Sequence, residues 1–206
     1  MKRGKFITLE GVDGAGKTTQ RTWIEQYLRD RGVSLIATRE PGGTPLGERL
    51  REMLLAPSGA GRLDPETETL LVFAARREHL AKVIVPALEA GTWVICDRFT
   101  DATFAYQCGG SGVSWGKVLE LERWVQEGLQ PDLTLFFDVE PEVGLARAQR
   151  IKAPDRFEAE QLDFHRRVRA AYARRAAEHP DRIRRIDASV SASEVQRELE
   201  EILSML

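Results

Sequence analysis

Apolar residues in this chain gather in five short runs, separated by longer stretches with helical spacing. The runs occupy residues 6–9, 33–38, 93–96, 133–138 and 182–187, and the fourth of them is almost continuously apolar. Such a run is typical of a strand that is buried on both faces of a parallel sheet. Five strands alternating with helices predict an α/β fold, a three-layer doubly wound five-stranded parallel sheet.

Two of the intervening stretches have clear ends. Asp64-Pro65 is a helix start with proline in the first turn, and we expect this helix to run to about Ala90, where Gly91 ends it. Apolar residues recur at helical spacing from Val195 to Leu206 and predict an amphipathic closing helix.

The most specific motif follows the first apolar run directly. The residues Gly11-Val12-Asp13-Gly14-Ala15-Gly16-Lys17-Thr18 match the spacing G-x-x-x-x-G-K-[ST] of a phosphate-binding loop. Glycines let the backbone N–H groups turn towards phosphate oxygens, and we expect Lys17 to reach the β- and γ-phosphates and Thr18 to ligate Mg²⁺. Because a strand precedes the motif and a helix follows it, a P-loop NTPase type of fold is predicted.

Length, charge and cysteine content narrow the class of protein to which this chain can belong. The 206 residues are enough for a single domain over 1–206, and 30 basic against 32 acidic residues leave a net charge of −2. This balance does not favour a nucleic acid or an anionic membrane as partner. No apolar run approaches the roughly 18 residues of a membrane span. Cys96 and Cys108 show no metal-ligand spacing, so we expect a cytoplasmic protein with reduced thiols.

Two charged segments end predicted strands. Asp97-Arg98 follows the third run, where Asp97 is a candidate Mg²⁺ ligand and Arg98 a candidate for binding an anionic substrate. An ordinary helix-capping aspartate is the alternative. The breaker-rich segment 39–45, Arg-Glu-Pro-Gly-Gly-Thr-Pro, lies where α/β proteins place ligands, although a polar surface turn has the same composition.

Arginines supply further candidates. One helical segment carries Phe73, Arg76 and Arg77 at helical spacing. This pattern predicts either an aromatic ring beside guanidinium groups in a site or a core phenylalanine beside solvated charges. The basic stretch 148–158 predicts a short lid that closes over phosphates, or else a solvated connection. His79, His165 and His179 lie in three separate helical segments and indicate neither a metal site nor a base.

The function class follows from what surrounds the phosphate loop. The chain contains no Asn-Lys-x-Asp motif, which guanine-specific switches use, and it is short for an ATP-driven motor. Instead it has many arginines beyond the loop, which suit a second anionic substrate because phosphoryl transfer depends on alignment and charge neutralisation. A small-molecule kinase is the better interpretation. These arginines are Arg39, Arg76, Arg77, Arg98, Arg147, Arg150 and Arg156.

Taken together, the motifs resemble those of the bacterial thymidylate kinase family. They are Gly11 to Thr19, the segment Arg39 to Thr44, Phe73 with Arg77, Asp97-Arg98 with Ala105-Tyr106-Gln107, and the segment Asp155 to Glu158. The resemblance covers essentially the whole chain. It implies in-line transfer of the ATP γ-phosphoryl group to dTMP, giving dTDP for dTTP synthesis, with Mg²⁺ as cofactor and a homodimer as assembly.

The resemblance also implies roles for single residues. For the base of dTMP it implies that Phe73 stacks on the thymine, Arg77 binds a base carbonyl and Thr103 lies near the base edge. For the sugar it implies that Tyr106 packs on the deoxyribose and that Asp13 accepts from the 3′-hydroxyl. It further implies that Arg98 and Arg39 hold the phosphate, that Glu40 lies near the metal and the phosphates, and that Gln107 belongs to the dTMP-binding residues. For ATP it implies that the loop residues Gly11 to Thr19 bind the nucleotide and that Arg147 lies against the adenine. For the metal it implies Thr18 and Asp97 as ligands.

Some points stay open. The phosphate loop offers no arginine at Gly14-Ala15, so the lid is expected to supply the catalytic cation, and Arg150, Lys152 and Arg156 are all candidates. Another nucleotide or deoxynucleoside kinase would differ in acceptor specificity. A nucleotide-dependent switch or binding module would bind nucleotide without acceptor-dependent release of ADP.

Overall fold

The predicted sheet is present in the structure, a computed structural model that describes residues 3–56, 63–150 and 155–206. Five parallel strands lie in the order β2-β3-β1-β4-β5. Their bounds are Phe6–Glu10 (β1), Leu35–Arg39 (β2), Trp93–Asp97 (β3), Leu133–Asp138 (β4) and Ile183–Asp187 (β5). The central strands β1 and β4 are buried along their whole length, as their apolar composition predicts.

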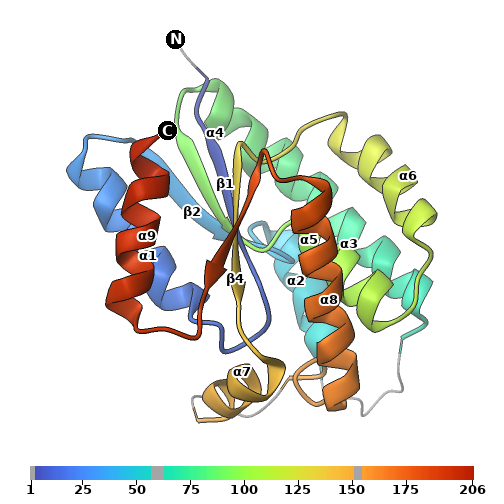
Figure 1. Cartoon of the computed structure of the whole chain (residues 1–206). Helices are drawn as coiled ribbons and strands as arrows, with labels where there is room; N and C mark the ends of the chain where they lie inside the picture. Colours follow the sequence, from blue (N-terminus) through green and yellow to red (C-terminus); the bar gives the residue numbers. More distant parts are fainter. Residues whose placement is uncertain (1–2, 57–62, 151–154) are drawn as a thin grey trace.

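Helices cover both faces of this sheet. Figure 1 shows α1 and α9 on one face and α3, α5, α6 and α8 on the other, which gives the three layers. The bounds are Lys17–Asp30 (α1), Pro45–Leu55 (α2), Pro65–His79 (α3), Val85–Glu89 (α4), Thr100–Thr103 (α5), Trp115–Gln126 (α6), Pro141–Ala148 (α7), Leu162–Glu178 (α8) and Ala192–Ser204 (α9).

The helix predicted over residues 64–90 is not regular throughout. A π-helical turn, η1 (Leu80–Ile84), separates α3 from α4. Pro86 lies just after it, and a proline has no N–H for the helical ladder and clashes with the preceding turn. A second π-helical turn, η2 (Phe104–Gly110), continues α5. Turns of this type occur frequently at functional sites.

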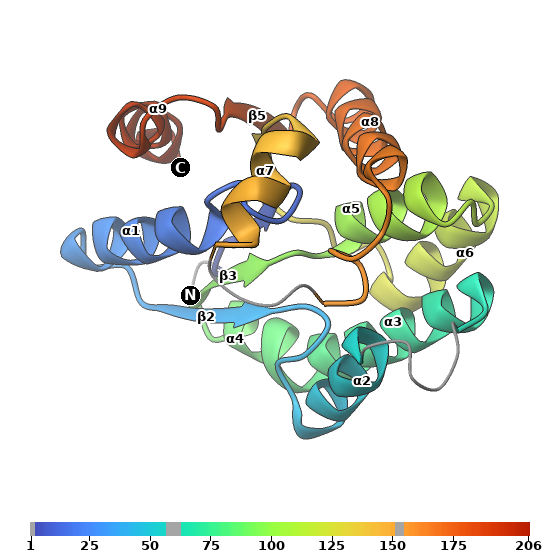
Figure 2. The same cartoon turned by 90° about the horizontal axis from the view of Figure 1, so that it is seen from below.

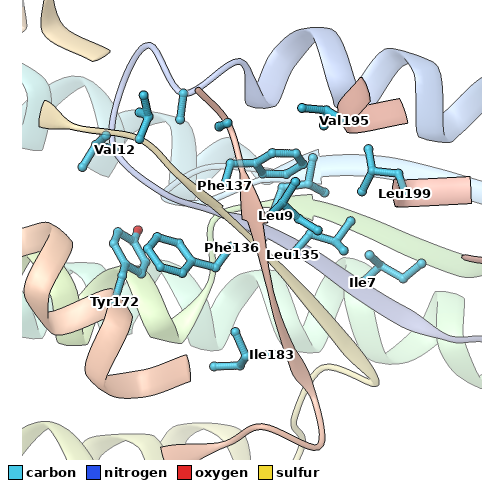
Figure 3. Close-up of a cluster of buried hydrophobic side chains, with 14 of the residues drawn as sticks. Ile7, Leu9, Val12, Leu135, Phe136, Phe137, Tyr172, Ile183, Val195 and Leu199 are labelled. Atoms are coloured by element: carbon cyan, nitrogen blue, oxygen red, sulfur yellow. The ribbon is translucent and has the colours of Figure 1, made fainter. Parts of the chain in front are cut away.

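Side chains of β4 alternate between the two faces of the sheet. Figure 3 shows Phe136 beside Tyr172 of α8, whereas Leu135 and Phe137 lie with Val195 and Leu199 of α9. The rings of Phe136 and Tyr172 stack with centroids 5.2 Å apart. Because α8 is fixed to the sheet here, the Tyr172 hydroxyl lies near the ends of β1 and β3, where it contacts Glu10 and Arg98.

All five strands end at the same edge of the sheet. In Figure 2, which views the molecule from below, α7 lies in front of this edge, beside the loop that connects β1 to α1. Ligands of open α/β sheets bind at such an edge. Among the residues described, no helix is long and apolar enough to cross a membrane.

Candidate active site

The predicted phosphate loop connects β1 to α1 in the conformation that its glycines allow. Gly14 has φ 73°, and a Cβ at this position would lie 1.9 Å from the carbonyl oxygen of Gly144 in α7. Only glycine fits between the loop and that helix. At Gly16, by contrast, an added Cβ would meet no atom within 4 Å. The loop is therefore closed towards α7 and open towards the start of α1.

Lys17 is folded back onto the loop. Its Nζ donates hydrogen bonds to the carbonyl oxygens of Gly11 at 3.0 Å and Val12 at 2.9 Å, and the residue is buried. Burial lowers the pKa of this ammonium group, as does the positive charge of Arg98, while the negative charge of Asp13 opposes the shift. The side chain is thus held at the loop, where it can exchange carbonyl oxygens for phosphate oxygens.

Arg98 joins the phosphate loop to the rest of the site. Its Nη1 donates to the Gly11 carbonyl at 2.9 Å and to the Tyr172 hydroxyl at 3.0 Å. Its Nη2 donates to Asp13 Oδ1 at 2.8 Å and to the Tyr106 hydroxyl at 3.0 Å. Arg98 also has φ 68°, which is uncommon for a residue with a side chain, and such backbone conformations cluster at active sites.

Asp13 is ionised in this setting. Burial alone would raise its pKa, but the positive charges of Arg98 and Lys17 outweigh burial and hold the pKa well below the usual range. The carboxylate also accepts a hydrogen bond of 3.2 Å from Tyr106. Of the residues predicted from the sequence, the structure brings Asp13, Lys17, Arg98 and Tyr106 together.

A carboxyl group and a phenol that the sequence analysis did not select lie behind Arg98. Glu10 is fully buried, and it accepts from the Phe99 N–H at 2.7 Å and from the Tyr172 hydroxyl at 2.8 Å. Burial, reinforced by the charge of Asp101, raises the pKa of Glu10 from 4.5 to about 8. The signal in the sequence was an acidic residue directly after the apolar run 6–9.

A cavity of about 130 Å³ opens beside Arg98. Six of the residues predicted for the second substrate line it, namely Asp13, Glu40, Arg98, Thr103, Tyr106 and Gln107. Its apolar wall includes Leu54, Val72 and Phe99. The cavity therefore combines an apolar wall with convergent polar groups, as small-molecule sites do.

Two predicted residues of α3 do not line this cavity. Phe73 is buried in an apolar cluster with Phe6, and Arg77 is half exposed and donates to the Val125 carbonyl of α6 at 3.3 Å. The residues one position earlier, Val72 and Arg76, line the cavity instead. Adjacent helix positions differ by about 100° in direction, so the packing of α3 decides which pair faces the site.

Arg76 is held rigidly. It is 1% exposed, its Nε donates to Glu40 Oε2 at 2.7 Å, and its Nη2 donates to Thr103 Oγ1 at 3.0 Å. The remaining nitrogen, Nη1, is buried and has no hydrogen-bond partner among the described residues. Since an unpaired buried guanidinium donor is costly, this atom is suited to a ligand oxygen.

The predicted phosphate contact of Arg39 also differs. Arg39 lies outside the cavity lining, and its guanidinium pairs with Glu48 at 2.7 Å on the surface. Arg51, which the sequence analysis did not consider, lines the cavity and donates to the Pro41 carbonyl at 3.0 Å. Arg51 therefore lines the cavity together with Arg98 and Arg76, whereas Arg39 does not.

A second hollow lies on the other side of the phosphate loop. Ala15, Gly16, Thr19 and Arg147 line it, together with residues of the turn after β5. Nη1 of Arg147 donates to the Ala188 carbonyl at 2.9 Å, so α7 and this turn are fixed to each other. The phosphate loop thus separates two binding spaces.

The candidate metal ligands lie next to the loop. Asp97 pairs with Leu9 in the sheet, and its Oδ1 is buried without a hydrogen-bond partner in the part of the chain that the structure describes. Thr18 lies exposed in the first turn of α1. A carboxylate and a hydroxyl with substrate phosphates are the ligands that Mg²⁺ commonly uses. The described residues contain no cluster of three metal-binding side chains.

Of the lid candidates, Lys152 lies outside the described residues. Arg150 is exposed, just after α7. Arg156 is buried, donates from Nε to the Leu54 carbonyl at 3.0 Å, and forms an ion pair with Glu68 of α3. Gln107 donates to the other oxygen of Glu68 at 2.8 Å. The structure gives Arg156 the contacts of an anchor and not those of a clamp for transferring phosphates.

Comparisons with known proteins point to one family. The family model described as thymidylate kinase matches residues 9–199. A thymidylate kinase of Nitrosospira multiformis is 57% identical over 99% of this chain and 98% of its own length, and one of Nitrosomonas europaea is 56% identical over 98% and 94%. The crystal structure of thymidylate kinase from Ehrlichia chaffeensis superposes with a TM-score of 0.78 at 35% identity and covers 98% of this chain and 99% of that one.

Proposed function

The chain belongs to the thymidylate kinase family, and from this membership we propose how its residues transfer a phosphoryl group from ATP to dTMP, giving dTDP and ADP. One observation carries the assignment of sites. The guanidinium of Arg98 is hydrogen-bonded both to the phosphate loop and to Tyr106 of the acceptor cavity. A cation between two phosphate sites neutralises charge where the phosphoryl group is transferred.

ATP is bound at the phosphate loop. The backbone from Gly11 to Thr18 surrounds the phosphates, Lys17 gives up its two carbonyl partners for β- and γ-oxygens, and Thr19 lies along the donor hollow. Arg147 lies against the adenine, because it lines the same hollow and is fixed to Ala188.

Mg²⁺ fits the site through Thr18 and Asp97. The observation that supports this is that Oδ1 of Asp97 is buried and has no partner among the residues described. A carboxylate oxygen without a donor suits a cation or a water of its shell. When bound, the ion would neutralise charge on the phosphates.

The acceptor phosphate and sugar are bound between Arg98, Arg51 and Tyr106. Asp13 and Arg98 satisfy each other at 2.8 Å in the structure. An arriving phosphate competes with Asp13 for Nη2 of Arg98, and the released carboxylate then accepts from the 3′-hydroxyl of the sugar. Tyr106 packs on the deoxyribose. The acceptor phosphate is already anionic, so no general base is required.

The base is bound by Arg76 and Val72, one helix position before the pair that the sequence suggested. Arg76 Nη1 donates to a base carbonyl, and Val72 with Phe99 packs on the ring. Thr103 holds Arg76 in place, and Gln107 lines the same wall. Discrimination of dTMP from dUMP rests on one methyl group, worth about 1–3 kcal/mol, so dUMP is a poor substrate and not an inert one.

The catalytic arginine of the lid is Arg150 in this proposal. Arg156 already pairs with Glu68 and donates to the Leu54 carbonyl. Arg150, by contrast, is exposed just after α7, the helix whose Gly144 packs against the phosphate loop at Gly14. Figure 2 shows α7 and the loop side by side at the edge of the sheet.

We also propose a homodimer in the cytoplasm. Large apolar side chains are exposed on two helices that contact each other, Leu70 of α3 at 55% and Trp124 of α6 at 76%. Such residues on neighbouring helices suit an interface with a second copy. Light scattering on the purified protein and on Trp124→Glu tests this, and a monomer in both samples contradicts it.

The function is tested by ADP release from Mg·ATP with dTMP, dUMP, dCMP, UMP, AMP and thymidine offered separately. We expect a strong preference for dTMP and weak activity with dUMP. Preference for another monophosphate would replace the base assignment while leaving a kinase. ATP binding without acceptor-dependent release of ADP would indicate a switch or binding module.

A further inference from the structure

A buried histidine that the reaction does not use lies behind the acceptor cavity. His79, the last residue of α3, is fully buried. Its Nδ1 lies 3.0 Å from Glu40 Oε1, and its Nε2 lies 2.7 Å from Thr38 Oγ1. These partners come from β2 and the loop after it, about forty residues earlier in the chain. A histidine with both nitrogens engaged has a defined orientation.

The contacts continue from Glu40 to the cavity. Glu40 is 4% exposed, and its second oxygen accepts from Arg76 Nε at 2.7 Å. Burial would raise the pKa of Glu40, but Arg76 and the hydrogen bond from His79 outweigh it and lower the pKa, so the group is a carboxylate. An ionised carboxylate only accepts hydrogen bonds, so Nδ1 of His79 carries the proton and donates. For a neutral ring, Nε2 then accepts from the Thr38 hydroxyl.

The loop that carries Glu40 packs directly on this histidine. A Cβ at Gly43 would lie 2.4 Å from His79 Nε2 and 2.7 Å from Thr38 Oγ1. Gly43 also has φ 76°, so a side chain is excluded there for two reasons. The imidazole therefore supports both the loop and the carboxylate, and the π-helical turn η1 begins immediately after it.

We propose that His79 is a positioning residue of the acceptor site: its Nδ1–H holds Glu40, and Glu40 holds Arg76 so that Nη1 faces the base. The Glu40 carboxylate selects the tautomer of His79 at Nδ1, and the Thr38 hydroxyl then donates to Nε2. The inference rests on the proposed binding of a base carbonyl by Arg76. A hydrogen bond to a charged group is worth enough that losing this one alters base affinity by about tenfold.

The test compares steady-state kinetics of His79→Gln, His79→Asn and Thr38→Val with wild type. In His79→Gln we expect the KM for dTMP to rise about tenfold, while the KM for ATP stays unchanged. The preference for dTMP over dCMP falls, because dCMP presents an amino group where dTMP presents a carbonyl, and a loosened arginine distinguishes the two less well. His79→Asn retains an N–H near the place of Nδ1 and restores most of the affinity.

Two further variants make each result decisive. His179→Asn changes a histidine outside this network and is expected to leave both KM values unchanged. Arg76→Met reports on the proposed function itself. If Arg76→Met raises the KM for dTMP and His79→Gln and Thr38→Val do not, the inference fails and the proposed function stands. If Arg76→Met leaves the KM for dTMP unchanged, the base assignment fails, and the inference fails with it.

Discussion

Replacing Arg156 separates an anchor from a catalytic clamp. The Arg156 side chain is 7% exposed and its partner Glu68 is 2% exposed, so the ion pair is shielded from water. Arg156→Met removes this pair and the bond to the Leu54 carbonyl, and among the described residues Glu68 keeps only its bond from Gln107. Breaking a buried pair from one side costs about 3–5 kcal/mol, because the remaining charge is uncompensated.

That cost has a measurable size in this chain. For a domain of this length, 1 kcal/mol shifts the Tm by about 2–4 °C, so we expect a decrease of roughly 6–20 °C. Differential scanning calorimetry measures it. The double variant Arg156→Met/Glu68→Met should recover most of the loss, since an apolar pair of similar volume is often as stable as the buried ion pair.

Catalysis should respond differently. Asp155 and Phe157 line the acceptor cavity, so loosening the anchor raises the KM for dTMP. At saturating substrates below the melting transition, we expect kcat to stay within about tenfold of wild type, whereas loss of a transition-state arginine costs about 10³–10⁵ in kcat. The matched control Arg150→Met, at an exposed position, should lose kcat at an unchanged Tm. A collapse of kcat in Arg156→Met with an unchanged Tm would refute the anchor.

Two further predictions concern the phosphate loop and the carboxyl group behind it. Lys17→Met should reduce kcat by at least about 10²-fold in a protein that is still folded by circular dichroism, because the ammonium group that binds the phosphates is lost. Near-normal turnover would contradict the assignment of the phosphate loop. Glu10 has a folded pKa raised by burial to about 8 against 4.5, so the folded state binds a proton that the unfolded state releases. Its contribution to the unfolding free energy therefore falls as pH rises from about 4.5 to 8, by at most about 1.4 kcal/mol per pH unit. Glu10→Gln should flatten urea-unfolding free energies between pH 5.5 and 8, and parallel curves for the two proteins would contradict the raised pKa.

The sheet and the phosphate loop could be predicted from the sequence because both depend on local information. The apolar run 133–138 predicts a buried strand, and the loop conformation depends on glycines at fixed spacing before Lys17. The end of the third strand likewise placed Asp97 and Arg98 at the site, because parallel strands end at one edge. These elements need no knowledge of distant partners.

Tertiary structure decided which face of α3 lines the cavity, and it decided the role of charged residues that lie far apart in the chain. Phe73 and Arg77 follow the same helical spacing as Val72 and Arg76, and only packing against the sheet sets which pair lines the cavity. Arg156 became an anchor because Glu68, 88 residues away, is buried beside it.

His79 shows the same limit most clearly. Its segment gave no sign of chemistry, since its partners are a threonine and a glutamate at the end of another strand. Helical spacing reports which residues share a face, and strand order reports which ends meet. The pairing of buried polar groups depends on the final packing of all these elements, because each burial is tolerated only where a partner is supplied.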